Sequence, residues 1–268
     1  PPFEYIDQGF HFAGYDPALL EALGRRLGLE VVIKDFALEG LADALALGQI
    51  DVAAAALTVT PERAAIVDFT QPYFATSEGF LAHDGADART IAAPEDLAGL
   101  RIGVEQGSIY ASWLRRALVD SGLSTAQELI LYTSIDAAAP DLAEGRIDLL
   151  VTDLPAAQQL ARQYNLSLVG QGLLAEQYAL AVRKGADELR GQLNTALTAL
   201  AADGTLARLA QGQLGLEPAQ LLPLGELPAA ASSAEAAAQE PPCVNGMAWL
   251  EDLSLPDQGM TTPAVMAP

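Results

Sequence analysis

Two stretches of this sequence place their elements in the same order, and this order restricts the fold more than any other feature. In "LALGQIDVAAAALTVTPER" (45–63) and "DLAEGRIDLLVTDLPAA" (141–157), a helical segment ends at a glycine, an Ile-Asp pair opens an apolar strand, and polar residues follow. Such alternation predicts βαβ units with a mainly parallel sheet. Since open α/β sheets bind ligands at the carboxyl ends of their strands, we expect these polar residues to contact a ligand.

Hydrophobic periodicity and glycine or proline positions predict the other elements. One helix follows Asp16, its expected N-cap, with Pro17 in the first turn and Gly28 at the end. Further helices are expected over 40–47, 110–119, 137–143, 155–163, 187–202 and 205–212. Strands are expected over 30–36, 50–56, 101–104, 129–132, 147–151, 166–169 and 176–185, with extended segments over 66–74 and 78–83.

The composition argues against several classes of protein. The formal net charge of -21 opposes nucleic-acid binding, because a phosphate backbone is bound by clustered Lys and Arg. No run of about 18 strongly apolar residues occurs, so we expect no membrane span. The single cysteine, Cys243, excludes an intrachain disulfide framework. A small molecule is therefore the expected partner.

Arg63 is the first candidate ligand contact. It falls in the first turn of a helix for which Thr60 is the expected N-cap, and a cation there opposes the helix dipole by roughly a few tenths of a kcal/mol. An ion pair with Glu62 or Asp68 would explain it, and so would a bound anion. Thr58, which capping does not explain, could donate its hydroxyl to the same anion.

A second set of polar residues lies in the other half of the chain. Asp153 ends an apolar strand, where its carboxylate could pair with an ammonium group or cap the helix expected from Pro155. Gly107 and Ser108 occupy a strand-to-helix turn, where backbone amides and a hydroxyl can bind an anion. One anion site and one cation site at facing strand ends suit a zwitterion.

Motifs for catalysis and metal binding do not occur. The sequence contains no GxSxG, HExxH, CxxC or Walker pattern. The two histidines, His11 and His83, fall in expected loops, where solvation explains them. We therefore expect no metal, no cofactor and no catalytic nucleophile.

In this context the chain resembles the bacterial extracellular solute-binding proteins of family 3, which bind polar amino acids for ABC importers. The resemblance covers roughly residues 1–215, and its most specific block is TPER-x4-DF-x2-PY. The matching stretches, in chain order, are "PPFEY", "GYDPALLEALGRRLGLEV", "LADALALGQIDV", "LTVTPERAAIVDFTQPYF", "EDLAGLRIGVEQGS", "LAEGRIDLLVTDLP" and "EQYALAVRKG". It implies an α/β, two-lobed type II periplasmic-binding fold, with a mainly parallel sheet in each lobe, a two-strand hinge and a ligand in the cleft.

The resemblance also implies roles for particular residues. Arg63 corresponds to the arginine that clamps the α-carboxylate of the ligand, assisted by Ser108 and the Gly107 loop. Thr58 and the carbonyl of Ala56 correspond to partners of the α-amino group. Its counter-ion is then Asp153.

Three features depart from the family pattern or restrict the ligand. The first strand of the family, and an aromatic residue that often walls the pocket, are expected upstream of Pro1. Leu38 stands where an aromatic residue is usual, with Phe36 close by. Glu105 corresponds to a position that faces the ligand side chain, so we expect a basic or amide-bearing amino acid.

These observations predict four regions and leave alternatives open. Lobe 1 is expected over 1–83 and 175–215, lobe 2 over 84–174, an acidic linker over 216–242, and the start of an immunoglobulin-like module over 243–268. An ABC permease is the expected partner and the location is expected to be extracytoplasmic, with a lipid anchor upstream as one option. The alternatives are a cyclohexadienyl-dehydratase-like enzyme, with Glu105 or Glu176 as general acid, and the ligand-sensing domain of a receptor.

Overall fold

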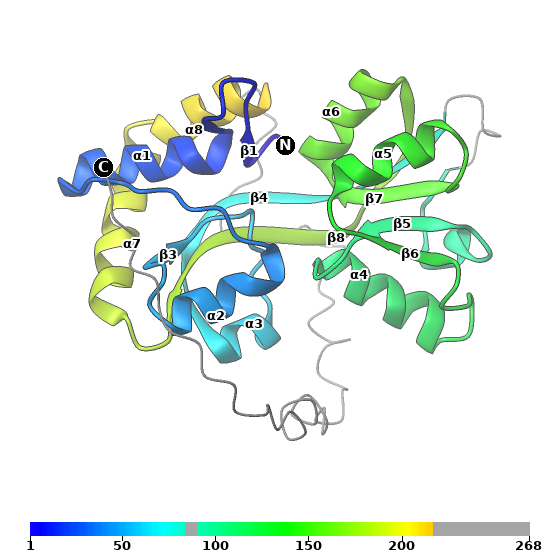
Figure 1. Cartoon of the computed structure of the whole chain (residues 1–268), viewed down its shortest axis with the longest axis horizontal. Coiled ribbons are helices and arrows are strands. Elements are labelled where there is room, and N and C mark those ends of the chain that lie inside the picture. Colours follow the sequence, from blue (N-terminus) through cyan, green and yellow to red (C-terminus); the bar gives the residue numbers. More distant parts are fainter. Residues whose placement is uncertain (84–89, 217–268) are drawn as a thin grey trace, which may run out of the picture. The chain divides into compact units, whose positions relative to one another are not determined.

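Two long antiparallel strands, β4 (Val67–His83) and β8 (Leu166–Arg183), run side by side through the middle of this computed structural model (Figure 1). Together they carry a sheet whose strand order, among the described residues, is β3-β8-β4-β7-β5-β6. The other strands of this sheet are β3 (Val52–Ala53), β5 (Ile102–Glu105), β6 (Leu129–Tyr132) and β7 (Leu149–Asp153). A separate hairpin consists of β1 (Tyr5–Ile6) and β2 (Phe12–Ala13).

The structure describes residues 1–83 and 90–216, without the side chain of Glu39. All of them belong to one unit, Pro1–Ser232. The predicted linker, apart from residue 216, and the predicted module over 243–268 lie outside the described residues.

Helices cover both sides of this sheet. They are α1 (Tyr15–Leu27), α2 (Leu41–Ala46), α3 (Pro61–Ile66), α4 (Ile109–Leu114), α5 (Ile135–Ala143), α6 (Leu154–Tyr164), α7 (Asp187–Ala202) and α8 (Thr205–Leu209). Short turns of tighter helix occupy Leu38–Gly40 and Pro94–Leu97, and widened turns extend α4 over Arg115–Asp120 and α8 over Ala210–Leu214. Within the described ranges, no helix combines the length and the apolar character needed to cross a bilayer.

The predicted α/β class is confirmed, and the parallel pairs are confined to one part of the sheet. β5 pairs with β6 and β7 in parallel, whereas β4 pairs with β7 and β8 in antiparallel fashion. β3 is also antiparallel to β8. Because β4 and β8 are shared by both ends of the sheet, they are the two strands that connect the lobes.

Lobe 2 is built around β7, β5 and β6, and both of its sheet faces are covered. Neighbouring residues alternate between two apolar clusters: Phe80 and Val151 belong to one, Leu81 and Leu150 to the other. The first cluster packs against α4, and the second against α5 and α6 (Figure 1). Side chains of successive strand residues point to opposite faces, so a strand buried on both faces is apolar throughout.

Lobe 1 has its own core at the other end of β4 and β8. Its aromatic centre joins Phe3 and Tyr15 to Phe74 and Tyr178, with ring centroids 5.2–6.1 Å apart. Helices α1, α7 and α8 pack against this centre, and a smaller cluster lies under α2. The predicted boundaries between the lobes, at 83/84 and 174/175, remain predictions.

Two local predictions are wrong for identifiable reasons. Asp16 is not the N-cap of α1: Gly14 is, and Asp16 lies buried in the first turn, where its carboxylate accepts hydrogen bonds from another part of the fold. The stretch 30–36 is not a strand in the structure, because no described strand pairs with it. An apolar pattern specifies a strand only when a neighbour completes its hydrogen bonds.

Pro72 lies inside β4, which runs without interruption through Gln71 and Pro72. Pro72 has no N–H to donate, and the register against β8 shifts on both sides of it. The Gln71 amide donates to the Asn194 side chain at 2.7 Å. Local shifts and a side-chain acceptor therefore let the proline stay within a continuous strand.

Candidate functional site

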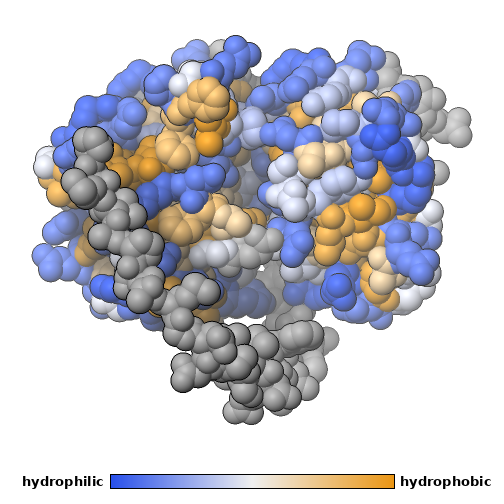
Figure 2. Space-filling view, in the orientation of Figure 1, coloured by the Kyte–Doolittle hydropathy of each residue, from blue (hydrophilic) through white to orange (hydrophobic). Residues whose placement is uncertain are grey.

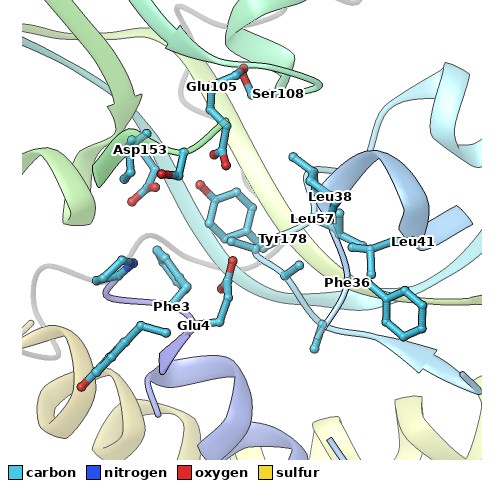
Figure 3. Close-up of a pocket in the computed structure, with 18 of the residues that line it drawn as sticks. Phe3, Glu4, Phe36, Leu38, Leu41, Leu57, Glu105, Ser108, Asp153 and Tyr178 are labelled. Carbon is cyan, nitrogen blue, oxygen red and sulfur yellow. The ribbon is translucent and has the colours of Figure 1, made fainter. Parts of the chain in front are cut away.

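A cavity of about 740 Å³ lies between residues of the two lobes. The space-filling view is hollowed between the lobes (Figure 2), and Figure 3 shows the side chains that line the cavity. Seven of the eight predicted site residues line it: Leu38, Ala56, Thr58, Arg63, Glu105, Ser108 and Asp153. The eighth, Gly107, is not among the lining residues, but its carbonyl accepts a hydrogen bond from Arg63.

Arg63 lies in the first turn of α3, as predicted. Thr60 caps this helix by accepting a hydrogen bond from the Arg63 amide at 3.2 Å. The guanidinium donates to the carbonyls of Thr58 (3.1 Å) and Gly107 (3.3 Å), while Asp68 pairs with Lys184 at 2.9 Å. Burial lowers the pKa of Arg63, and the charge of Glu176 opposes this shift. The side chain is thus directed across the cleft.

Thr58 and Ala56 follow strand β3 on the same side of the cavity. The Thr58 side chain is buried, and its hydroxyl donates to Glu176 Oε2 at 2.8 Å. Ala56 has a φ of 44°, in the left-handed region that few residues other than glycine adopt. Its amide donates to Asp16 Oδ2 at 2.7 Å, which stabilises this conformation.

Ser108 caps α4 and so has a structural role besides the predicted one. Its Oγ accepts from the Ala111 amide at 3.2 Å and donates to the Glu105 carbonyl at 2.7 Å. Gly107, just before it, has a φ of 77°, which suits glycine. A bond from the Ser108 hydroxyl to a ligand would require its hydrogen to leave the Glu105 carbonyl.

Asp153 combines both explanations offered for it. It caps α6, since Oδ1 accepts from the Ala156 amide at 2.9 Å, and it also lines the cavity. Burial raises the pKa of Asp153 to about 6, with the Ala156 hydrogen bond acting in the opposite direction. Near neutral pH the group is mainly ionised and can attract a cation.

Glu176 and Tyr110 also line the cavity, although no local pattern in the sequence predicts either as a ligand contact. Glu176, expected only as an alternative general acid, is 2 % exposed. Its Oε1 accepts a hydrogen bond from the Tyr110 hydroxyl, and its Oε2 accepts one from Thr58. Burial raises the pKa of Glu176 to about 8, against the lowering effect of these two bonds.

Glu4 was also missed. In Figure 3 it extends into the cavity beside Tyr178, whereas Glu105 and Asp153 enter from the opposite side. The side chain stays accessible to solvent, and the surrounding protein, followed by the negative charge of Asp16, raises the pKa of Glu4. The charges of Asp153 and Glu105 act in the same direction.

The apolar wall of the cavity is aliphatic near the predicted position. Leu38, Leu41 and Leu57 face the same region in Figure 3, while the Phe36 ring is directed away from its centre. Within 1–83 and 90–216, no group of three His, Cys, Asp or Glu side chains is arranged to hold a metal ion.

The profile of the bacterial extracellular solute-binding proteins, family 3, matches residues 1–215. The chain belongs to this family. The predicted family resemblance is therefore confirmed over the range that was expected.

Individual relatives are similar over most of their length. The L-cystine-binding protein TcyJ of Escherichia coli K12 is 29% identical over 81% of this chain and 80% of its own. The L-arginine-binding protein of Pseudomonas aeruginosa is 31% identical over 76% of this chain and 80% of its own. A solved structure of an ancestral arginine-binding protein bound to arginine is 32% identical, covers 80% of this chain and 93% of its own, and superimposes with a TM-score of 0.73.

Proposed function

We propose that this protein binds an amino acid between its two lobes outside the cytoplasm and delivers it to an ABC importer. The observation that supports this most strongly is that Arg63, on α3, and Asp153, at the end of β7, line the same cavity. One carries a guanidinium and the other a carboxylate. The α-carboxylate and α-ammonium groups of an amino acid complement this pair.

Arg63 suits the carboxylate end. A guanidinium presents five N–H donors in a planar fork, so its two bonds to carbonyls do not exhaust it. Closing the cleft would remove water and strengthen the remaining charge-assisted bonds. Asp153 suits the ammonium end, because one carboxylate oxygen caps α6 while the other faces neighbouring polar groups.

The charges of the cavity favour a ligand whose side chain is cationic. Six acidic side chains line it, against the two cationic side chains of Lys34 and Arg63, so the acids outnumber the cations even with Glu176 neutral at pH 7. The six are Glu4, Asp35, Glu105, Asp136, Asp153 and Glu176. An ammonium or guanidinium group on the ligand would offset part of this negative charge, whereas an uncharged amide would donate fewer and weaker hydrogen bonds to these oxygens. The names of the arginine-binding relatives agree with this preference.

Delivery requires that a partner distinguish bound from empty protein. Strands β4 and β8 run through both lobes and are the natural site of bending. A ligand that contacts both Arg63 and Asp153 would stabilise the closed arrangement, because only that arrangement completes both sets of contacts. The partner would then be an ABC permease that binds the closed form in preference to the open one.

Calorimetry against a panel of amino acids tests this function. The panel contains arginine, lysine, histidine, glutamine, cystine and glutamate. At least one should bind with a dissociation constant on the order of micromolar or below, and Arg63→Ala should abolish that binding. Arg101→Ala is the matched control, because Arg101 pairs with Asp148 at 2.7 Å away from the cavity. Absence of binding across the panel would contradict the proposal.

One observation favours an enzyme as the second candidate. Glu176 is a buried carboxylic acid with a raised pKa at the cavity, as a general acid would be. Against this, both of its oxygens are engaged by Thr58 and Tyr110. Incubation with prephenate or arogenate, followed by assay for the aromatic product, would detect a dehydratase. The receptor alternative depends on residues after 216, which the structure does not describe.

A further inference from the structure

A ring of hydrogen bonds, closed by short backbone segments, links the two lobes at the proposed ligand site. Glu176, on β8, accepts from Thr58 through Oε2 and from Tyr110 through Oε1. Thr58 follows β3 in lobe 1, whereas Tyr110 belongs to α4 in lobe 2. One carboxylate on a strand shared by both lobes therefore binds a side chain from each.

Arg63 completes the ring. Its Nη1 donates to the Thr58 carbonyl at 3.1 Å, so the residue that holds Glu176 through its hydroxyl also holds the guanidinium through its backbone. Its Nη2 donates to the Gly107 carbonyl at 3.3 Å, three residues before Tyr110 in the chain. The path from Arg63 through Thr58, Glu176 and Tyr110 thus returns to Arg63 through Gly107.

The ring is largely shielded from water. Glu176 is 2 % exposed, and Thr58 and Tyr110 are each 7 % exposed. In such surroundings a polar atom that loses its partner cannot exchange it for water, so the loss of one bond is felt by the others. The position of the guanidinium therefore depends on Glu176 and Tyr110 as well as on Thr58.

We propose that Glu176 is a positioning residue: through Thr58 and Tyr110 it holds Arg63 in place and couples capture of the ligand's carboxylate to the approach of the lobes. The proposal rests on the proposed function, since it assigns the carboxylate of an amino acid to Arg63. It goes beyond that function by assigning a role to a carboxylate that the ligand need not touch.

The charge of Glu176 should matter as well as its hydrogen bonds. The ionisable groups that face it come from several elements: Tyr110 from α4, Tyr178 from β8, Asp153 from β7, Glu78 from β4 and Arg63 from α3. Burial raises the pKa of Glu176 to about 8, and the negative charges of Asp153 and Glu78 add to this.

At neutral pH the group is therefore mainly the neutral acid, which can accept a hydrogen bond from one hydroxyl and donate its own proton to the oxygen of the other, and which leaves the positive charge of Arg63 to the ligand. Above pH 8 the ionised carboxylate competes with the ligand's carboxylate for that charge. Affinity should therefore fall as pH rises through this range. For a group of pKa about 8, the neutral fraction falls roughly fourfold between pH 6.5 and 8.5.

The experiment uses the whole chain and L-arginine as the probe, with calorimetry from pH 6.5 to 8.5. Wild type should lose up to roughly fourfold in affinity over this range. In Glu176→Gln, which mimics the neutral acid, the affinity for arginine should no longer fall between pH 6.5 and 8.5. Tyr110→Phe, which breaks the ring on the lobe 2 side, should weaken binding roughly tenfold. Tyr132→Phe is the matched control, because its hydroxyl donates to Asp141 Oδ2 at 2.7 Å outside the ring; it should bind as wild type does.

The failures of the two proposals are distinguishable. Suppose that wild type binds arginine. If the affinity of Glu176→Gln then depends on pH as that of wild type does, or if Tyr110→Phe binds arginine as tightly as wild type, the positioning role is wrong and the binding function stands. If wild type binds no amino acid, the binding function is wrong, and the ring is tested without ligand. Nuclear magnetic resonance should then show the Arg63 Nε–H signal displaced from its wild-type position in Tyr110→Phe and unchanged in Tyr132→Phe. The same signal position in wild type and Tyr110→Phe would contradict a positioning role of the ring for Arg63.

Discussion

The backbone amide of Ala56 donates a 2.7 Å hydrogen bond to Asp16 Oδ2, which joins the first helix to the loop that borders the cavity. The other oxygen, Oδ1, accepts from the Tyr73 hydroxyl at 2.8 Å. Asp16 has no exposed surface, and Ala56 adopts a φ of 44°. A buried carboxylate thus stabilises an uncommon backbone conformation at a predicted ligand contact.

This arrangement should make stability depend on pH. Burial raises the pKa of Asp16 to about 6, above its unfolded value near 3.8. The folded state therefore binds this proton more tightly, and the stability it contributes is present below about pH 4 and lost as pH rises through 6, by up to about 3 kcal/mol. Urea denaturation at pH 4.5 and 7.5 should show a smaller pH dependence for Asp16→Asn than for wild type. Equal dependence would contradict the assignment.

Asp153→Asn should weaken amino-acid binding without unfolding α6. Asparagine caps helices as well as aspartate does, so the bond to Ala156 is kept while the negative charge is lost. We expect a loss of at least about tenfold in affinity, because a charged bond to an ammonium group contributes about 1.5–3 kcal/mol. Calorimetry with arginine and a thermal melt would separate the two effects. A variant that melts normally and binds normally would exclude Asp153 as the counter-ion.

The wild-type affinity should also fall on the acidic side. The pKa of Asp153 is raised to about 6 by burial, so below this pH the carboxylate becomes neutral and no longer attracts the ligand's ammonium group. Titrations with arginine at pH 5 and 7 should show weaker binding at pH 5. In Asp153→Asn the affinities at pH 5 and pH 7 should be nearly equal. If the variant still binds more weakly at pH 5, another group causes the loss of affinity in acid.

Ligand choice should depend on the carboxylates that face each other across the cavity. Glu4→Gln and Glu105→Gln each remove one negative charge and keep the shape, so each should lower the preference for arginine over glutamine by roughly five- to tenfold. Glu188→Gln, on the exposed start of α7, serves as the control. Unchanged selectivity in both cleft variants would show that these residues do not face the ligand's side chain.

Packing of β8 against the segment at Ile91 gives a prediction that does not involve the ligand. A Cβ at Gly170 would lie 2.7 Å from the Cβ of Ile91 and would also meet its backbone carbonyl, so Gly170→Ala should destabilise the fold by about 1–3 kcal/mol. Gly191 lies within α7, and a Cβ there has no heavy atom within 4 Å. Gly191→Ala should stabilise by about 0.5–1 kcal/mol. Chemical denaturation of both variants measures the change in the free energy of unfolding, which should be negative for Gly170→Ala and positive for Gly191→Ala.

The site residues that the sequence predicted are those whose local chemistry is distinctive. Arg63 follows Thr60-Pro61, a pair that marks the start of a helix. Asp153 precedes Leu154-Pro155, where another helix starts. Such short-range signals place a side chain at the end of a strand without knowledge of the whole fold. Their common cavity then follows from the strand order.

Glu4 and Glu176 could not be predicted in this way. Glu4 belongs to a segment without regular structure, and Glu176 lies in the interior of a long strand, where no turn or helix start marks it. Each reaches the cavity only because distant parts of the chain pack together, as in the contact between Thr58 and Glu176, 118 residues apart. The strand predicted over 30–36 is wrong for a related reason. Its apolar pattern is local, but a strand also needs a partner, and no described strand pairs with this stretch.

The most direct test of the central claim compares L-arginine with two derivatives blocked at one end each. The account predicts that calorimetry will show L-arginine bound with a dissociation constant on the order of micromolar or below. The methyl ester, which removes the carboxylate that Arg63 should hold, and Nα-acetyl-L-arginine, which removes the ammonium that Asp153 should hold, should each bind at least about 100-fold more weakly. Binding of either derivative as tight as that of arginine would contradict a grip on both ends of the ligand.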